Sequence, residues 1–168
     1  MNATPPQAAT AVGHPFRFDT IQFIPNDCFA TMREEEALQL PGGVRLYADR
    51  ESEGVAGVSE VGDFESLHSL PILTAAGEAF LFRKLNYLRY RAAELSNELD
   101  ANDVVEQAES EVANLLKDAE GVRNHLVECN RRLVFSIARK FAADQNAFDA
   151  LVSRGELILL KAIDKFAS

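Results

Sequence analysis

The chain has 168 residues, of which 47% are hydrophobic and 26% are charged, a balance that fits one compact domain with a tail. It contains no run of about 18 apolar residues, so no membrane-spanning helix is expected. The net charge of −9 opposes long-range attraction to nucleic acid. Only residues 122–168, with five acids and eight bases, are positive, at +3.

The beginning of the chain lacks a basic stretch followed by an apolar stretch, so no signal peptide is predicted. Cys28 and Cys129 lie far apart and form neither a metal motif nor a redox motif. Two free thiols are typical of a reducing compartment, and a cytoplasmic location is therefore expected.

Residues 1–70 are predicted to be a flexible acidic segment. Its first 15 residues are rich in Ala, Thr and Pro, a composition typical of disorder. The apolar residues of the short motif at 16–26 are mostly spaced by two or three, as in an extended strip. This strip either docks on a helical body, which we favour, or binds a partner. Residues 40–69 mix glycines with acids and are predicted to be a mobile linker, with DNA mimicry as the less favoured alternative.

Residues 71–166 are predicted to form a bundle of four helices. Thr74 is the expected N-cap of the first, and an apolar stripe in steps of three and four follows it to position 99. Residues 100–103 interrupt the pattern and can cap the second helix, and Gly121 is expected to stop or kink it. Helices at 122–141 and 148–166 complete the bundle, in which Gly155 is expected to allow close helix packing. The residues expected to point inward are Leu85, Leu88, Leu133, Ile137, Leu159 and Ile163.

Signals of enzyme chemistry are poor. The three histidines, His14, His68 and His125, are scattered, and each is expected to be a surface or capping group. The sequence has no HExxH motif, no phosphate-binding glycine loop and no nucleophile elbow. The chain is therefore predicted not to be an enzyme and to use no metal or cofactor.

Two groups of bases are candidates for binding. Arg131, Arg132, Arg139 and Lys140 form either a solvated helix face or a binding face, and the sequence favours neither. Within the first helix, bases interleave with Tyr87 and Tyr90, a pattern that can follow single-stranded nucleic acid through phosphate contacts and ring stacking. The favoured alternative is that the tyrosine rings pack on neighbouring helices and keep their hydroxyls solvated. The bases concerned are Arg83, Lys84, Arg89 and Arg91.

Three stretches resemble one family. Residues 130–141 read NRRLVFSIARKF, and residues 148–166 read FDALVSRGELILLKAIDKF. Both are similar to the second conserved region of the bacterial sigma-70 family, the promoter-specificity subunits of RNA polymerase. Residues 70–91 and the FIPN motif at 23–26 are similar to upstream segments of one sub-group. The resemblance therefore implies a sigma region 1.2/2-like helical domain at 71–166 and a role in promoter-directed transcription initiation.

In that family the last two helices dock on the clamp coiled coil of the largest subunit of core RNA polymerase. The positions that the resemblance assigns to this docking are Arg131, Val134, Asp149, Ala150, Ser153, Arg154, Glu156 and Leu160. Ala150 and Arg154 stand where the family has acids, Arg131 stands where it has Leu, and Glu156 stands where it has Asn. These departures alter the binding surface, and a reversed interfacial charge can cost several kcal/mol.

The resemblance also implies contacts of Arg83, Lys84, Arg89 and Arg91 with DNA, in which they would act as part of a holoenzyme. The aromatic segment that opens promoter DNA in the family follows position 166 there and is not found in this sequence. A C-terminally truncated factor is therefore expected. One alternative is a sigma-like interaction module that binds core polymerase or a sigma regulator without recognising promoters. Another is a helical protein that has kept the fold and lost the function.

Overall fold

A computed structural model describes residues 21–49, 70–101 and 106–166. These residues form helices α1 (Glu34–Leu38), α3 (Ala75–Ala101), α4 (Glu106–Phe141) and α5 (Gln145–Lys165). Within the same ranges the only β structure is an isolated antiparallel bridge between Tyr47 and Leu73. The predicted all-α helical bundle is confirmed. Expectations for residues 1–20, 50–69 and 102–105 fall outside the described residues.

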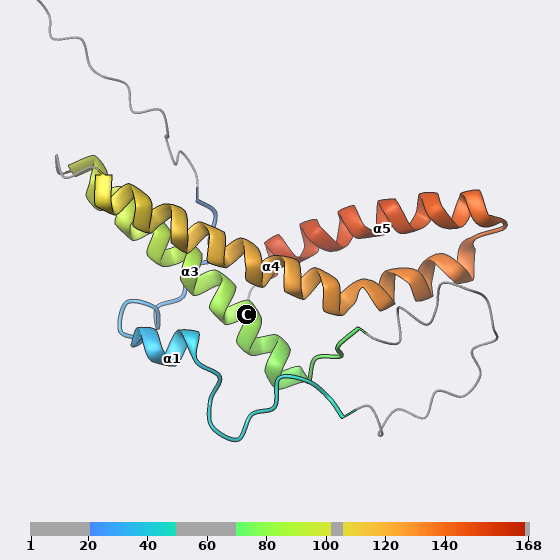
Figure 1. Cartoon of the computed structure of the whole chain (residues 1–168), viewed down its shortest axis with the longest axis horizontal. Coiled ribbons are helices and arrows are strands. Elements are labelled where there is room, and N and C mark those ends of the chain that lie inside the picture. Colours follow the sequence, from blue (N-terminus) through green and yellow to red (C-terminus); the bar gives the residue numbers. More distant parts are fainter. Residues whose placement is uncertain (1–20, 50–69, 102–105, 167–168) are drawn as a thin grey trace, which may run out of the picture.

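Figure 1 shows how the long helices are arranged. The first half of α4 runs along α3, and its second half continues beyond α3 and pairs with α5 in a helical hairpin. The C-terminal end of α5 returns to the place where α3 and α4 meet. The molecule thus has a helical body, from which a two-helix hairpin projects.

The prediction that Gly121 stops a helix is wrong, because α4 is one continuous helix from 106 to 141. Gly121 is exposed, and a Cβ atom there would meet nothing within 4 Å. Val112, Ala119 and Leu126 lie seven residues apart on one face, and all three are buried. We infer that continuous packing of this face offsets the helix cost of about 1 kcal/mol for a solvent-facing glycine.

Two polar side chains cap helices. The Gly77 amide donates to Oγ1 of Thr74 at 2.9 Å, which confirms Thr74 as the N-cap of α3. Asp144 caps α5, where its Oδ1 accepts a hydrogen bond from the Ala147 amide at 2.8 Å. The sequence prediction began this last helix at 148, three residues after its observed start.

The main core lies where α3, α4 and the end of α5 meet. Leu85, Leu88 and Ile163 are buried in it, as predicted, and Leu159 packs against it while partly buried. The inward placement of Leu133 and Ile137 is wrong, because these side chains are 57% and 48% exposed. Both belong to the second half of α4, which pairs with α5 rather than with α3 (Figure 1).

The segment before α1 docks on α3. The side-chain amide of Asn86 accepts a hydrogen bond from the Ile24 amide at 2.7 Å and donates one to the Ile24 carbonyl at 2.6 Å. The Phe23 ring meets the Tyr90 ring edge-on, with centroids 5.6 Å apart. Docking on the helical body, the favoured alternative for this strip, is therefore confirmed for its described part, residues 21–26.

Residues 44–49, predicted to belong to a mobile linker, are instead paired with the start of α3. The Ala48 amide donates to the Ile72 carbonyl at 2.8 Å, and the Thr74 amide donates to the Leu46 carbonyl at 3.0 Å. The Tyr47 hydroxyl also lies 3.0 Å from Nε2 of His125 on α4. These contacts join residues far apart in the sequence, so the local composition gave no sign of them.

Candidate functional site

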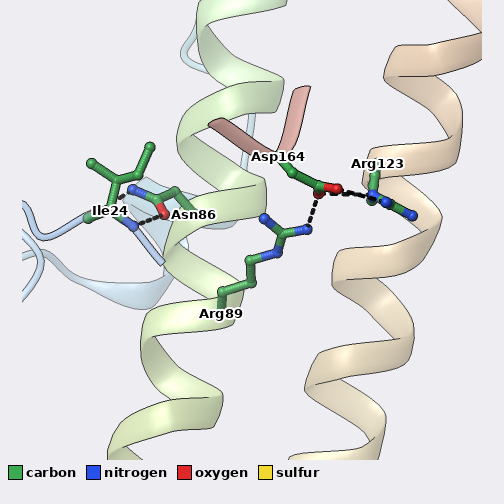
Figure 2. Close-up of polar contacts among 5 residues, drawn as sticks. All are labelled: Ile24, Asn86, Arg89, Arg123 and Asp164. Carbon is green, nitrogen blue, oxygen red and sulfur yellow. Dashed lines mark hydrogen bonds and ion pairs between the residues drawn. The ribbon is translucent and has the colours of Figure 1, made fainter. Parts of the chain in front are cut away.

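An ion triad fixes the point where the hairpin leaves the body. Asp164 of α5 accepts hydrogen bonds from Arg89 of α3 at 2.7 Å and from Arg123 of α4 at 2.8 and 2.6 Å (Figure 2). All three side chains are less than one-third exposed. The triad therefore joins all three long helices at one point.

The charge state of Asp164 follows from two opposed effects. Burial alone would raise the pKa of this carboxyl group. The hydrogen bonds and positive charges of Arg123 and Arg89 outweigh burial, so the pKa is lowered from its ordinary value. Asp164 is thus held ionised, and it keeps the two guanidinium groups paired.

The predicted DNA-contacting bases on α3 are largely engaged within the protein. Arg89 belongs to the triad, and Arg91 forms an ion pair with Glu94 at 3.0 Å. The guanidinium of Arg83 lies 5.9 Å from the centre of the Phe80 ring, and its buried Nε has no hydrogen-bond partner. Lys84 is half-buried. Two of the four bases, Arg89 and Arg91, are thus engaged in ion pairs within the protein.

Tyr87 and Tyr90 pack as in the favoured alternative, but mainly on the N-terminal segment rather than on neighbouring helices. Tyr87 is buried, with its ring edge-on to that of Phe29 at 5.7 Å between centroids. The Tyr90 hydroxyl donates to the carboxylate of Glu94. Burial removes the Tyr87 ring as a stacking platform for bases, and the Tyr90 ring contacts Phe23 and Phe29.

The interior of the hairpin depends on close approach at Gly155. A Cβ atom at this position would lie 2.5 Å from Cγ1 of Val134, so the glycine allows α5 to approach α4, as predicted. Val134 is itself buried, which removes it from the exposed docking surface that the sequence suggested. Arg131 and Glu156, also assigned to docking, form an ion pair with each other at 2.8 Å. These three residues hold the hairpin together.

The remaining docking positions lie on the outer surface of α5. Asp149, Ala150, Ser153 and Arg154 are all exposed, and they occupy neighbouring turns of the helix. Leu160 is half-buried. The structure thus brings four of the eight assigned residues into one exposed strip, which we call the α5 strip.

The basic cluster on α4 is divided by its surroundings. Arg131 and Arg132 are half-buried, whereas Arg139 and Lys140 are exposed near the tip of the hairpin. Because Arg132 and Arg139 lie seven residues apart, they share a helix face, as the spacing predicted. The cluster is therefore partly a support for the hairpin and partly a charged surface.

An open cavity of about 610 Å³ lies between residues 21–25, α3 and the end of α5. Its lining includes Asn86, Arg89 and Asp164. Each of these polar groups already has a partner, either Ile24 or a member of the triad. We therefore assign no ligand to this cavity.

Two further titratable side chains, Cys129 and His125, lie close together on α4. Cys28 and Cys129 are free thiols, as predicted, and burial is the main cause that raises the pKa of Cys129 to about 11. Sγ of Cys129 lies 3.6 Å from Nε2 of His125. In residues 21–49, 70–101 and 106–166, no three side chains of His, Cys, Asp or Glu gather closely enough to hold a metal ion.

Comparison with known proteins gives no match to a family model or to a solved structure. None of the described helices has both the length and the hydropathy needed to cross a membrane. Sequence reasoning missed the pairing of Arg123 with Asp164, because the two residues are 41 positions apart and no local spacing links them. Only correlated charge changes at these two positions in related sequences would reveal such a pair.

Proposed function

We propose that this chain is the N-terminal, core-polymerase-binding part of a sigma-70 family transcription initiation factor. The observation that carries the proposal is the projecting α4–α5 hairpin with its exposed α5 strip. This hairpin is formed by the residues whose sequence resembles the family, 130–141 and 148–166. A projecting pair of helices offers a surface on which a coiled coil can pack.

The chemistry of the strip sets the expected strength of docking. Ala150 and Arg154 lie four residues apart on α5, so they share a face. If the family's acids at these positions meet basic groups of the clamp, Arg154 adds repulsion and Ala150 removes attraction. Docking of the natural chain is then expected to be weak.

The double change Ala150→Asp with Arg154→Glu is expected to tighten binding to a purified clamp coiled-coil fragment. A solvent-exposed charge pair contributes under about 1 kcal/mol and a desolvated pair contributes more, so the gain lies between a few-fold and roughly a hundredfold. The measurement is the dissociation constant of each chain at two salt concentrations. Raised salt should reduce the difference between them.

Ala113→Asp with Lys117→Glu is the matched control. Both residues are exposed on α4, they are also four apart, and the net charge changes by the same amount. The control chain should bind the clamp fragment no more tightly than the natural chain. If the natural chain and the Ala150→Asp with Arg154→Glu variant bind equally, Arg154 lies outside the docking surface. If neither binds, core binding is rejected.

A second candidate is an interaction module that binds core polymerase or a sigma regulator without recognising promoters. The observation that favours it is the engagement of Arg89 and Arg91 in ion pairs within the protein. Sequence readout requires contacts with base edges, for which these side chains would have to be released.

The isolated chain is accordingly expected to bind promoter duplex weakly, without sequence preference and with strong dependence on salt. Fluorescence anisotropy with a promoter duplex and a scrambled duplex of equal length measures this directly. Sub-micromolar affinity for the promoter alone at physiological salt would reject this second candidate and favour the initiation factor.

A further inference from the structure

Three side chains that can bind a metal ion meet where residues 44–49 contact the middle of α4. Nε2 of His125 lies 3.0 Å from the Tyr47 hydroxyl oxygen and 3.6 Å from Sγ of Cys129. His125 and Cys129 are four residues apart on α4, so their side chains share one face of this helix. Tyr47 approaches them from a segment that lies 78 positions before His125 in the chain. One imidazole nitrogen therefore has both a sulfur atom and an oxygen atom beside it.

These separations allow a tetrahedral zinc ion with little rearrangement. Zinc binds imidazole nitrogen at about 2.0–2.1 Å and thiolate sulfur at about 2.3 Å. At the tetrahedral angle these two bonds place nitrogen and sulfur about 3.6 Å apart. Nε2 of His125 and Sγ of Cys129 have this separation. A nitrogen and an oxygen ligand would lie about 3.3 Å apart, so the Tyr47 oxygen would have to shift only slightly from its present 3.0 Å.

The far side of the imidazole ring supports the same role for Nε2. Oε2 of Glu128 lies 3.9 Å from Nδ1 of His125. A carboxylate near Nδ1 favours the tautomer with its hydrogen on that nitrogen, and histidine ligands of zinc commonly have such a partner. In this tautomer Nε2 carries a lone pair, which now accepts a hydrogen bond from the Tyr47 hydroxyl. The nitrogen that can bind a metal is therefore the one that lies beside Cys129 and Tyr47.

The chemistry of the three donors selects among metal ions. Imidazole and thiolate suit Zn²⁺, whereas Mg²⁺ and Ca²⁺ prefer oxygen ligands. Cys129 is buried, so its thiol keeps its proton until a metal ion displaces it. Tyr47 is 42% exposed and the His125 side chain is 29% exposed, so an ion can reach the donors from solvent.

We propose that His125, Cys129 and Tyr47 bind a zinc ion that fastens residues 44–49 to α4. On binding, Nε2 exchanges the hydrogen bond from Tyr47 for a bond to the metal, and Sγ releases its proton to solvent and binds as thiolate. The Tyr47 hydroxyl turns its oxygen lone pair to the ion as the third ligand, and water takes the fourth position. Histidine, cysteine and acidic side chains alone do not make up this site, because its third donor is a tyrosine. The proposal goes beyond polymerase binding and does not depend on it.

Titration of the untagged full chain with Co²⁺, in the presence of a reductant that does not bind metals, tests the site. Co²⁺ substitutes for Zn²⁺, and its bond to a thiolate gives an intense near-ultraviolet charge-transfer absorption. This absorption should saturate at one Co²⁺ per chain and should disappear when Zn²⁺ is added. Cys129→Ser should abolish it. Cys28→Ser, which removes the exposed thiol elsewhere in the chain, is the matched control and should leave it intact.

Two variants at partly exposed positions test the other donors without disturbing a buried residue. His125→Gln and Tyr47→Phe should each weaken Co²⁺ binding at least about tenfold, since loss of a group that only orients a ligand already costs that much. Circular dichroism checks that both variants keep their helices. In the natural chain Zn²⁺ should also slow hydrogen exchange at the Ala48 amide, which pairs with Ile72. In Tyr47→Phe this slowing should be lost.

The proposal is overturned if no thiolate absorption appears, if the absorption depends on Cys28 instead of Cys129, or if His125→Gln binds Co²⁺ as tightly as the natural chain. Saturation at one Co²⁺ per two chains would overturn it in favour of a site between copies. If Tyr47→Phe binds the ion equally or more tightly, Tyr47 only competes for Nε2 through its hydrogen bond, and the fastening of residues 44–49 to α4 is rejected.

Discussion

Asp164→Asn is expected to lower the free energy of unfolding by about 2–3 kcal/mol, because it leaves Arg89 and Arg123 partly buried without a counter-charge. This loss in the free energy of unfolding is smaller than for a fully buried ion pair, because all three side chains are partly exposed to solvent. Urea denaturation followed by circular dichroism measures the effect. Asp149→Asn, the same change at an exposed position of α5, is the control and should cost under about 0.5 kcal/mol.

The same triad predicts how stability depends on acid. The folded pKa of Asp164 is lowered, so its contribution is fully present above the unfolded pKa of about 4. That contribution is lost as the pH falls through the lower folded pKa. The stability difference between the natural chain and Asp164→Asn should therefore shrink below about pH 4. A difference that stays constant down to pH 2 would show that the triad does not hold Asp164 ionised.

Gly77→Ala is expected to cost about 2 kcal/mol and to detach residues 44–49 from α3. An added Cβ would overlap the Leu46 carbonyl oxygen and would lie 2.9 Å from its carbonyl carbon and Cα, so the backbone of that segment must move. Hydrogen exchange should then accelerate at the Ala48 and Thr74 amides, which pair the segment with the start of α3.

Gly121→Ala supplies the matched control for that change. It is the same substitution within a helix, but at an exposed position where the new Cβ would meet nothing within 4 Å. Because alanine favours the helix, this variant should be more stable than the natural chain by about 0.5–1 kcal/mol. Two variants of equal stability would contradict the close approach of Leu46 to Gly77.

The regular part of the fold could be predicted from local sequence. The apolar stripe of α3 and its Thr74 cap were sufficient to predict this helix and its start, because helix periodicity and capping involve residues within a few turns. Gly155 was correctly predicted to be a point of close packing. Glycine is unfavourable within a helix, so its presence there indicates close approach of another helix. The docking of Ile24 was also favoured correctly, since its apolar neighbours indicated burial.

Only the tertiary structure decided which helical faces are covered. Leu133 and Ile137 have the same periodicity as the buried Leu85 and Leu88, yet they are exposed because α4 continues beyond α3. How far one helix extends past its neighbour depends on tertiary packing, and the local spacing of apolar residues does not encode it.

The roles of the charged residues were likewise decided by tertiary contacts. Arg89 and Arg91 look alike in sequence, but Arg89 closes a triad with an acid 75 residues away, while Arg91 pairs within its own helix. The sequence by itself determined that the chain is helical and where α3 is capped. The structure determined which bases are engaged and which surface of the α4–α5 hairpin is open, because both depend on contacts between distant residues.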